Sequence, residues 1–103
     1  MVVVVVAHVF PISERREEVV RVLERTAQLV HEEEGCQLFA LHESKDGFAI
    51  LEQWRDSAAL KAHGSGPVYA QMVDSLEGLL AKPMEVHMLK PLPVGDPALG
   101  ALR

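Results

Sequence analysis

The first ten residues contain the feature that most limits how this chain can fold. Residues 2–6 are five consecutive valines, and the apolar run continues to Phe10 with His8 as its one polar residue. β-branched residues favour strands, and a strand without alternation of polar and apolar positions needs cover on both faces. We therefore expect residues 2–10 to form a central strand of a sheet.

The sequence after this strand predicts helices and three more strands. An apolar stripe at steps of three and four predicts a helix that ends before Gly35. Residues 36–43 and 48–55 have strand-like composition on either side of a turn signal that contains Asp-Gly, which predicts a hairpin. Asp56 can cap a short helix over 57–63, a second helical stretch starts at Pro67, and residues 84–89 form the last strand.

This order, βαββαβ, predicts an α+β fold of the ferredoxin-like class: a four-stranded antiparallel sheet with two helices on one face. We expect one domain over residues 1–90 and a C-terminal arm over 91–103, where proline and glycine are frequent. The helices cover one face of such a sheet, yet strand positions of both parities are apolar. A second copy of the chain is the economical cover for the other face, so we expect a homodimer.

Composition narrows the function classes. A chain of 103 residues with net charge −5 and no cluster of Lys or Arg argues against a nucleic-acid partner. The valine run is far shorter than the roughly 20 residues that cross a bilayer, and its flanks lack the pattern of an export signal, so no membrane partner is expected. Cys36 is the one cysteine, which excludes an intrachain disulfide and fits a reducing, cytoplasmic location.

Glu52 is an acid within an apolar row of the third predicted strand. It lies two residues from Ile50 and from Trp54, so all three face the same side. An ionised carboxylate in such a place must find a partner or raise its pKa, which often marks a functional acid. Pairing with a basic group or across the dimer is the structural alternative. Trp54 either packs in the core with one hydrogen bond or walls a ligand pocket.

His63 ends the short predicted helix, just before a glycine-rich break. Its imidazole either stabilises the helix C-terminus or points into an adjoining cavity as a base. His8 offers a polar group on an otherwise apolar strand. The five histidines are not at metal-ligand spacing, so no metal site is expected. For three further residues, packing in the core is the first interpretation and lining a pocket is the second: Phe39, Tyr69 and Met72.

The order of these landmarks resembles the antibiotic biosynthesis monooxygenase family, whose members are also called quinol-monooxygenase-like proteins. The landmarks are the valine-rich strand, Glu34-Gly35-Cys36, Glu52-x-Trp54, and the segment from Asp56 through Leu60 to His63. The resemblance covers residues 2–89. It implies a dimeric α/β barrel, formed when two ferredoxin-like sheets meet, with a pocket between sheet and helices in each subunit.

The resemblance also implies a cofactor-independent monooxygenase that uses dioxygen to oxidise a small hydroxylated aromatic or quinol, without metal, flavin or haem. In this interpretation an enzyme base removes a phenolic proton and the protein supplies desolvation and orientation. His63 and Glu52 are then the catalytic candidates. The substrate-binding candidates are Trp54, Phe39, Tyr69, His8 and Met72.

Two positions depart from the pattern of the family, and two more differ from a related branch. Many family members carry a second histidine where Val68 stands and an aromatic hydroxyl where Phe39 stands. The haem-degrading branch of the superfamily has a tryptophan in place of His63 and a histidine in place of Val73, so haem is not expected. Two alternative functions stay open: a non-catalytic dimeric module that binds or regulates through a small molecule, and a proton-transfer isomerase.

Overall fold

The computed structural model describes residues 1–102 and contains the predicted elements in the predicted order. The elements are β1 (Val3–Val9), α1 (Arg16–Val30), β2 (Cys36–Ser44), β3 (Gly47–Trp54), α2 (Ser57–Gly64), α3 (Pro67–Leu76) and β4 (Glu85–Leu89). A short 3₁₀ turn, Ser13–Arg15, precedes the first helix. The strand boundaries, both ends of α2 and the start of α3 lie within one residue of the predicted ones, whereas α1 ends at Val30, five residues before Gly35.

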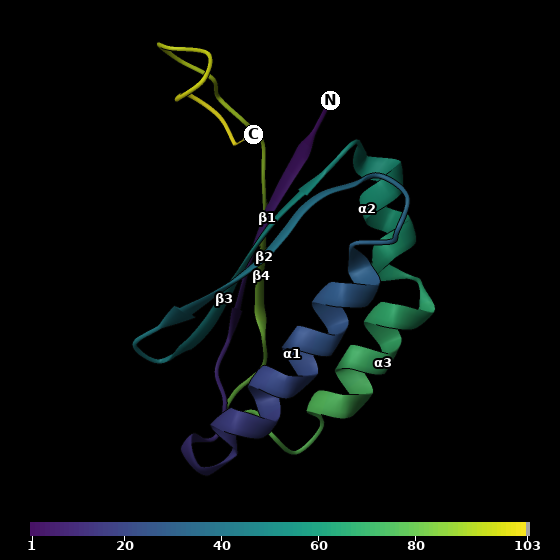
Figure 1. Cartoon of the computed structure of the whole chain (residues 1–103), viewed down its shortest axis with the longest axis vertical. Coiled ribbons are helices and arrows are strands. Elements are labelled where there is room, and N and C mark those ends of the chain that lie inside the picture. Colours follow the sequence, from purple (N-terminus) through teal and green to yellow (C-terminus); the bar gives the residue numbers. More distant parts are fainter. Residues whose placement is uncertain (103) are drawn as a thin grey trace.

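The sheet has the strand order β2-β3-β1-β4, and every neighbouring pair is antiparallel. β1 is therefore central, as the valine run predicted. All helices lie on one face, with α1 and α3 side by side and α2 at one end of the layer (Figure 1). The ferredoxin-like α+β class is confirmed. The second crossover is divided between α2 and α3, so within residues 1–102 the helical layer has three α-helices rather than two.

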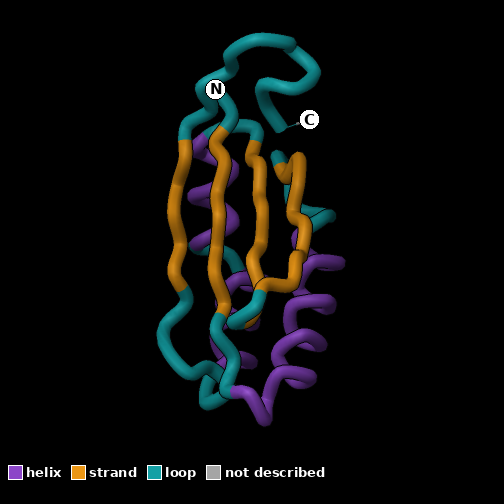
Figure 2. Tube along the Cα trace, turned by 90° about the vertical axis from the view of Figure 1, so that its left-hand side faces the viewer, coloured by secondary structure: helices purple, strands orange, loops and turns teal. Residues whose placement is uncertain are grey.

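The face of the sheet that meets the helices carries the core. Val5, Ala7 and Val9 of β1 pair across the ladder with Glu52, Ile50 and Phe48 of β3, and all six are buried. Because side chains alternate along a strand, Val4 and Val6 point to the other face, which no helix covers (Figure 2). These valines of a central strand are partly exposed.

Residues 90–102 contain no helix or strand. They follow β4 and extend beyond the end of the sheet near the N-terminus (Figure 1). Asp96 accepts hydrogen bonds from the backbone of Leu99 and Gly100, so this segment folds back on itself. Arg103, the last residue of the predicted arm, lies outside the described residues. None of the helices in residues 1–102 has the length and apolar content needed to cross a membrane.

Gly35 connects α1 to β2 at a point of close approach. Its φ of +83° is in the left-handed region that glycine favours. The sequence position of Gly35 suggested that it directly follows the last turn of the helix, but α1 ends at Val30 and Gly35 lies further along the loop. A Cβ atom there would lie 2.5 Å from the Cβ of Ala59 in α2. Gly35 therefore lets the loop after α1 touch the first turn of α2.

Replacing Gly35 by Ala tests this contact, and Gly78 provides the matched control. Gly78 has a similar φ of +79°, but a Cβ there meets nothing within 4 Å. Gly78→Ala should lower the free energy of unfolding by the cost of left-handed backbone alone, about 1–2 kcal/mol. Gly35→Ala should lose a further 1–3 kcal/mol or so through overpacking against Ala59. Urea unfolding measures both, and equal losses would contradict the close contact.

The homodimer stays a prediction. If a second copy covers the face that carries Val4 and Val6, light scattering at low micromolar concentration should give about twice the chain mass of 11.4 kDa. Such an interface should exceed about 1,000 Å². Val6→Lys places a charge on this face and should shift the equilibrium to monomer, whereas a folded wild-type monomer at this concentration would contradict the expectation.

Candidate active site

A cavity lies between the helix-facing side of the sheet and helices α2 and α3. Its volume is about 170 Å³. The mouth is formed by edge strand β4, where the side chains of Val86 and Met88 are 50% and 72% exposed. The lining residues are Val5, Ala7, Phe39, Ile50, Glu52, Leu60, His63, Gly64, Tyr69, Met72, Met84, Val86 and Met88. The cavity is therefore apolar, with a carboxyl group and an imidazole as its ionisable groups besides the Tyr69 phenol.

His63 is held on the wall of the cavity by four neighbours. Its Nδ1 lies 3.0 Å from Oε1 and 3.2 Å from Oε2 of Glu33. The imidazole stacks on Trp54 with ring centroids 4.6 Å apart and an angle of 28° between the planes. The rings of Phe39 and Tyr69 meet it edge-on. The side chain is 6% exposed, so it is a buried histidine with a carboxylate partner.

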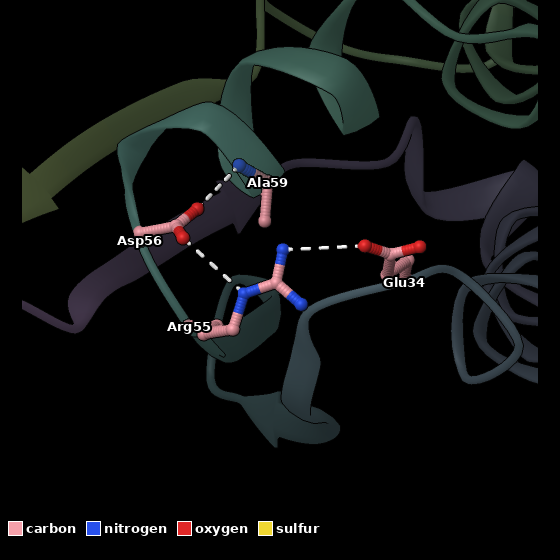
Figure 3. A network of polar contacts seen from close by, with 4 residues as sticks. All are labelled: Glu34, Arg55, Asp56 and Ala59. Carbon is pink, nitrogen blue, oxygen red and sulfur yellow. Dashed lines mark hydrogen bonds and ion pairs between the residues drawn. The ribbon is translucent and has the colours of Figure 1, made fainter.

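Hydrogen bonds and an ion pair connect the loop between α1 and β2 to the start of α2. These contacts bring Glu33 close to His63. The Arg55 backbone N–H donates to the Gly35 carbonyl at 2.8 Å. Asp56 caps α2, as predicted, by accepting from the Ala59 N–H at 2.8 Å, and its other oxygen accepts from the Arg55 side chain (Figure 3). Arg55 also reaches Glu34 of the loop, 3.4 Å away.

Glu52 faces the same cavity from β3. The indole Nε1–H of Trp54 donates to its Oε1 at 2.9 Å, within the same strand. Burial raises the pKa of Glu52 above its ordinary value; the bond from Trp54 and the nearby His63 act against this rise, and Glu33 adds to it. Within one chain, the hydrogen-bond partner of Glu52 is therefore an indole and not a basic side chain.

The structure brings most of the predicted site residues together. Phe39, Glu52, His63, Tyr69 and Met72 all line the cavity. His63 was open to two interpretations, and its side chain bonds to Glu33 rather than to the last carbonyls of its helix.

Two predicted substrate-binding residues do not line the cavity. Trp54 is fully buried behind His63 and supports the site through its stacking and its hydrogen bond. His8 lies on the opposite face of the sheet, since its position in β1 has the parity of Val6, and its ring is near those of Phe10 and His87. The period of two along a strand excludes His8 from the cavity that Ala7 lines.

Sequence reasoning missed Glu33 as a site residue. It follows Val30, the last residue of the apolar stripe in α1, by the helical step of three, which was the available signal. The three residues of the mouth, Met84, Val86 and Met88, were also missed. Their alternation was visible in the sequence, but the cavity that they line together with residues of α2 and α3 was not.

No three potential metal ligands from histidine, cysteine, aspartate or glutamate gather within residues 1–102. The cavity volume is below the range of about 300–1,000 Å³ that is common for pockets of drug-sized ligands. It is close to the roughly 150 Å³ of an apolar cavity that holds benzene. One aromatic ring fits inside, and a larger ligand would extend through the mouth at β4.

Comparison with known proteins adds a family match. A family model described as "Antibiotic biosynthesis monooxygenase" matches residues 2–75. A protein of Mycobacterium tuberculosis named "Putative monooxygenase Rv0793" is 30% identical over 92 residues, which cover 87% of this chain and 91% of that protein. The solved structure of Rv0793 has a TM-score of 0.85 at 28% identity and covers 93% of this chain and 100% of its own. The structure of PA3566 from Pseudomonas aeruginosa has a TM-score of 0.80 at 26% identity, with coverages of 88% and 94%.

Replacing Glu52 by Gln tests the cost of burying this carboxyl group. Because folding raises the pKa of Glu52 above its ordinary value of 4.5, the folded protein binds this proton more tightly than the unfolded chain does. The free energy of unfolding of the wild type therefore falls as the pH rises from the ordinary value through the raised one. The Glu52→Gln variant has no titrating group at this position, so its free energy of unfolding does not fall in this way. As the pH rises, its free energy of unfolding should therefore increase relative to that of the wild type, by about 1.4 kcal/mol for each unit by which folding raises the pKa of Glu52.

Urea unfolding at a series of pH values measures this difference. Glu24→Gln, on the exposed surface of α1, is the matched control and should differ from the wild type by no more than about 0.5 kcal/mol. A Glu52→Gln difference that does not change with pH would mean that folding leaves the pKa of Glu52 unaltered.

Proposed function

The chain belongs to the antibiotic biosynthesis monooxygenase family, and on this premise we propose that it is a cofactor-independent monooxygenase for a small hydroxylated aromatic or quinol. The observation that carries the proposal is a buried histidine with a carboxylate partner on the wall of an apolar cavity. The name of the M. tuberculosis relative supports the same class of reaction.

The substrate should bind as a neutral molecule. No Lys or Arg is among the residues that line the cavity. An anion would enter an apolar space next to Glu52, with the Glu33 carboxylate directly behind His63. Such an ion would lose its hydration without gaining a cationic partner. A neutral phenol or quinol instead finds aromatic and aliphatic walls and a nitrogen that accepts its proton.

The chemistry begins with proton transfer from the substrate hydroxyl to His63. The O–H bond breaks, an N–H bond forms on the imidazole, and the aromatic ring becomes an electron-rich anion. A ring carbon of this anion then binds dioxygen and supplies the electrons that reduce it. The resulting peroxide takes up a proton. The C–H bond at the same ring carbon then breaks: its electrons form the new C=O bond, and its proton returns to the group that protonated the peroxide. The O–O bond breaks, and the hydroxide that leaves takes the proton from His63 to become water. One oxygen atom remains in a quinone and the other is in the water, so the substrate is the sole reductant.

Glu52 offers a role in the later proton transfer. In its protonated form it is a donor inside the same cavity as the histidine, and burial favours this form. It can therefore supply the proton that the peroxide needs. The same pair of an acid and a base in one cavity favours proton-transfer isomerisation as the second candidate function, since an isomerase moves a proton between two carbons or oxygens without dioxygen.

Oxygen uptake tests the proposal. Metal-free protein should consume dioxygen with at least one member of a panel of hydroquinones and naphthols, followed with an oxygen electrode. His63→Gln should lower the rate by about 10² to 10⁴, the usual contribution of a positioned base.

His42→Gln is the matched control, because His42 is an exposed histidine at the far end of β2 from the loop that holds Glu33. Its rate should equal that of the wild type. Tight binding across the panel without oxygen uptake would overturn the monooxygenase proposal in favour of a binding protein. Exchange of substrate hydrogen with solvent deuterium, again without oxygen uptake, would favour the isomerase.

A further inference from the structure

The hydrogen bond between Glu33 and His63 has only one direction while the carboxylate is ionised. A carboxylate is an acceptor, so the proton of this bond belongs to Nδ1 of the imidazole. Both carboxylate oxygens lie within 3.2 Å of Nδ1. Since the nitrogen that carries the proton in a neutral histidine is set by its hydrogen-bond partner, Glu33 selects the form of His63 with a hydrogen on Nδ1 and a lone pair on Nε2.

The lone pair on Nε2 has access to the cavity. Within residues 1–102, Nδ1 is the one atom of this ring that makes a hydrogen bond, and no fully buried side-chain nitrogen lacks a partner. Nε2 is therefore not fully buried. His63 is 6% exposed and lines the cavity, which is the open space next to its ring.

The ring has little freedom to turn over. Trp54 stacks on one of its faces, and Tyr69 and Phe39 meet it edge-on at centroid distances of 5.6 and 6.1 Å. A rotated imidazole would break the bond to Glu33 in a place where burial makes a lost hydrogen bond costly. Glu33 is itself partly buried, with 22% of its side chain exposed, and its loop is fastened to α2 by Arg55.

We propose that Glu33 is the positioning residue of this site: it directs the Nε2 lone pair of His63 at a hydroxyl group in the cavity and stabilises the imidazolium that proton transfer creates. The position of the proton on the ring follows from the geometry of this hydrogen bond and the ionised state of Glu33, whatever reaction the site performs. The part that concerns turnover rests on the proposed function. In that part the negative charge of Glu33 remains on the far side of the ring from the ligand, where it compensates the new positive charge.

Nitrogen NMR of protein labelled with ¹⁵N in its histidines tests the position of the proton without any substrate. Correlation of the ring carbon-bound protons with the two nitrogens distinguishes a protonated from an unprotonated nitrogen, and the signals of His63 are those that disappear in His63→Gln. At mildly alkaline pH the wild type should show a protonated Nδ1 and an unprotonated Nε2. Glu33→Ala should move proton occupancy towards Nε2, and Glu32→Ala, at the exposed neighbouring position, should leave the wild-type pattern.

A wild-type spectrum with the proton on Nε2, or with both nitrogens protonated at that pH, would overturn the proposal without need of a variant. So would a folded Glu33→Ala protein with an unchanged pattern. Glu33→Gln retains an acceptor oxygen and removes the charge, so it should keep the proton on Nδ1 and lower kcat about ten- to a hundred-fold with little change in KM. The expected nitrogen pattern in a protein that oxidises no phenol would support the positioning role and refute the proposed function.

Discussion

The absence of a side chain at Gly35 determines how the two halves of this fold meet. A Cβ atom there would enter the space of the Ala59 methyl group, so only glycine allows the loop after α1 to rest on the first turn of α2. The loop supplies Glu33 and the helix supplies His63, and these residues are thirty positions apart in the chain. A steric condition on one residue thus fixes the relative position of the two groups on which the proposed chemistry depends.

Trp54 connects the fold to the chemistry by a second constraint. The indole is fully buried, stacks on His63 and donates its one N–H to Glu52. Burying an indole N–H without a partner costs the free energy of a lost hydrogen bond, and burying a carboxyl group without a partner costs more free energy. Each therefore satisfies the other. The same ring that completes the core limits the orientation of the imidazole and the carboxyl group.

Periodicity explains what the sequence could and could not predict. The uninterrupted valines placed β1 in the centre, and the spacing of two placed Glu52 and Trp54 on one face, because both patterns are local properties of a strand. His8 was expected in the cavity, although its parity differs from that of Ala7 and directs it to the other face. The spacing of Glu33 from Val30 hinted at its direction, but its contact with His63 was not predictable, since the two residues are distant in sequence and the contact depends on the path of the loop around Gly35.

The inner wall and the rim of the cavity differ in how easily their backbone and side chains can adjust. Its inner wall belongs to β1 and β3, each of which is hydrogen-bonded on both sides, and to the stacked rings around His63. Its rim belongs to β4, an edge strand with one free side, and to methionines such as Met84 and Met88, whose unbranched side chains adapt to irregular shapes. In the proposed reaction, the inner wall would thus hold the proton acceptor in place, while the adaptable rim would leave the outline of the substrate less strictly defined. Such a division suits tolerance towards substituents: ligands that share a hydroxyl on an aromatic ring can differ widely in what projects past the rim.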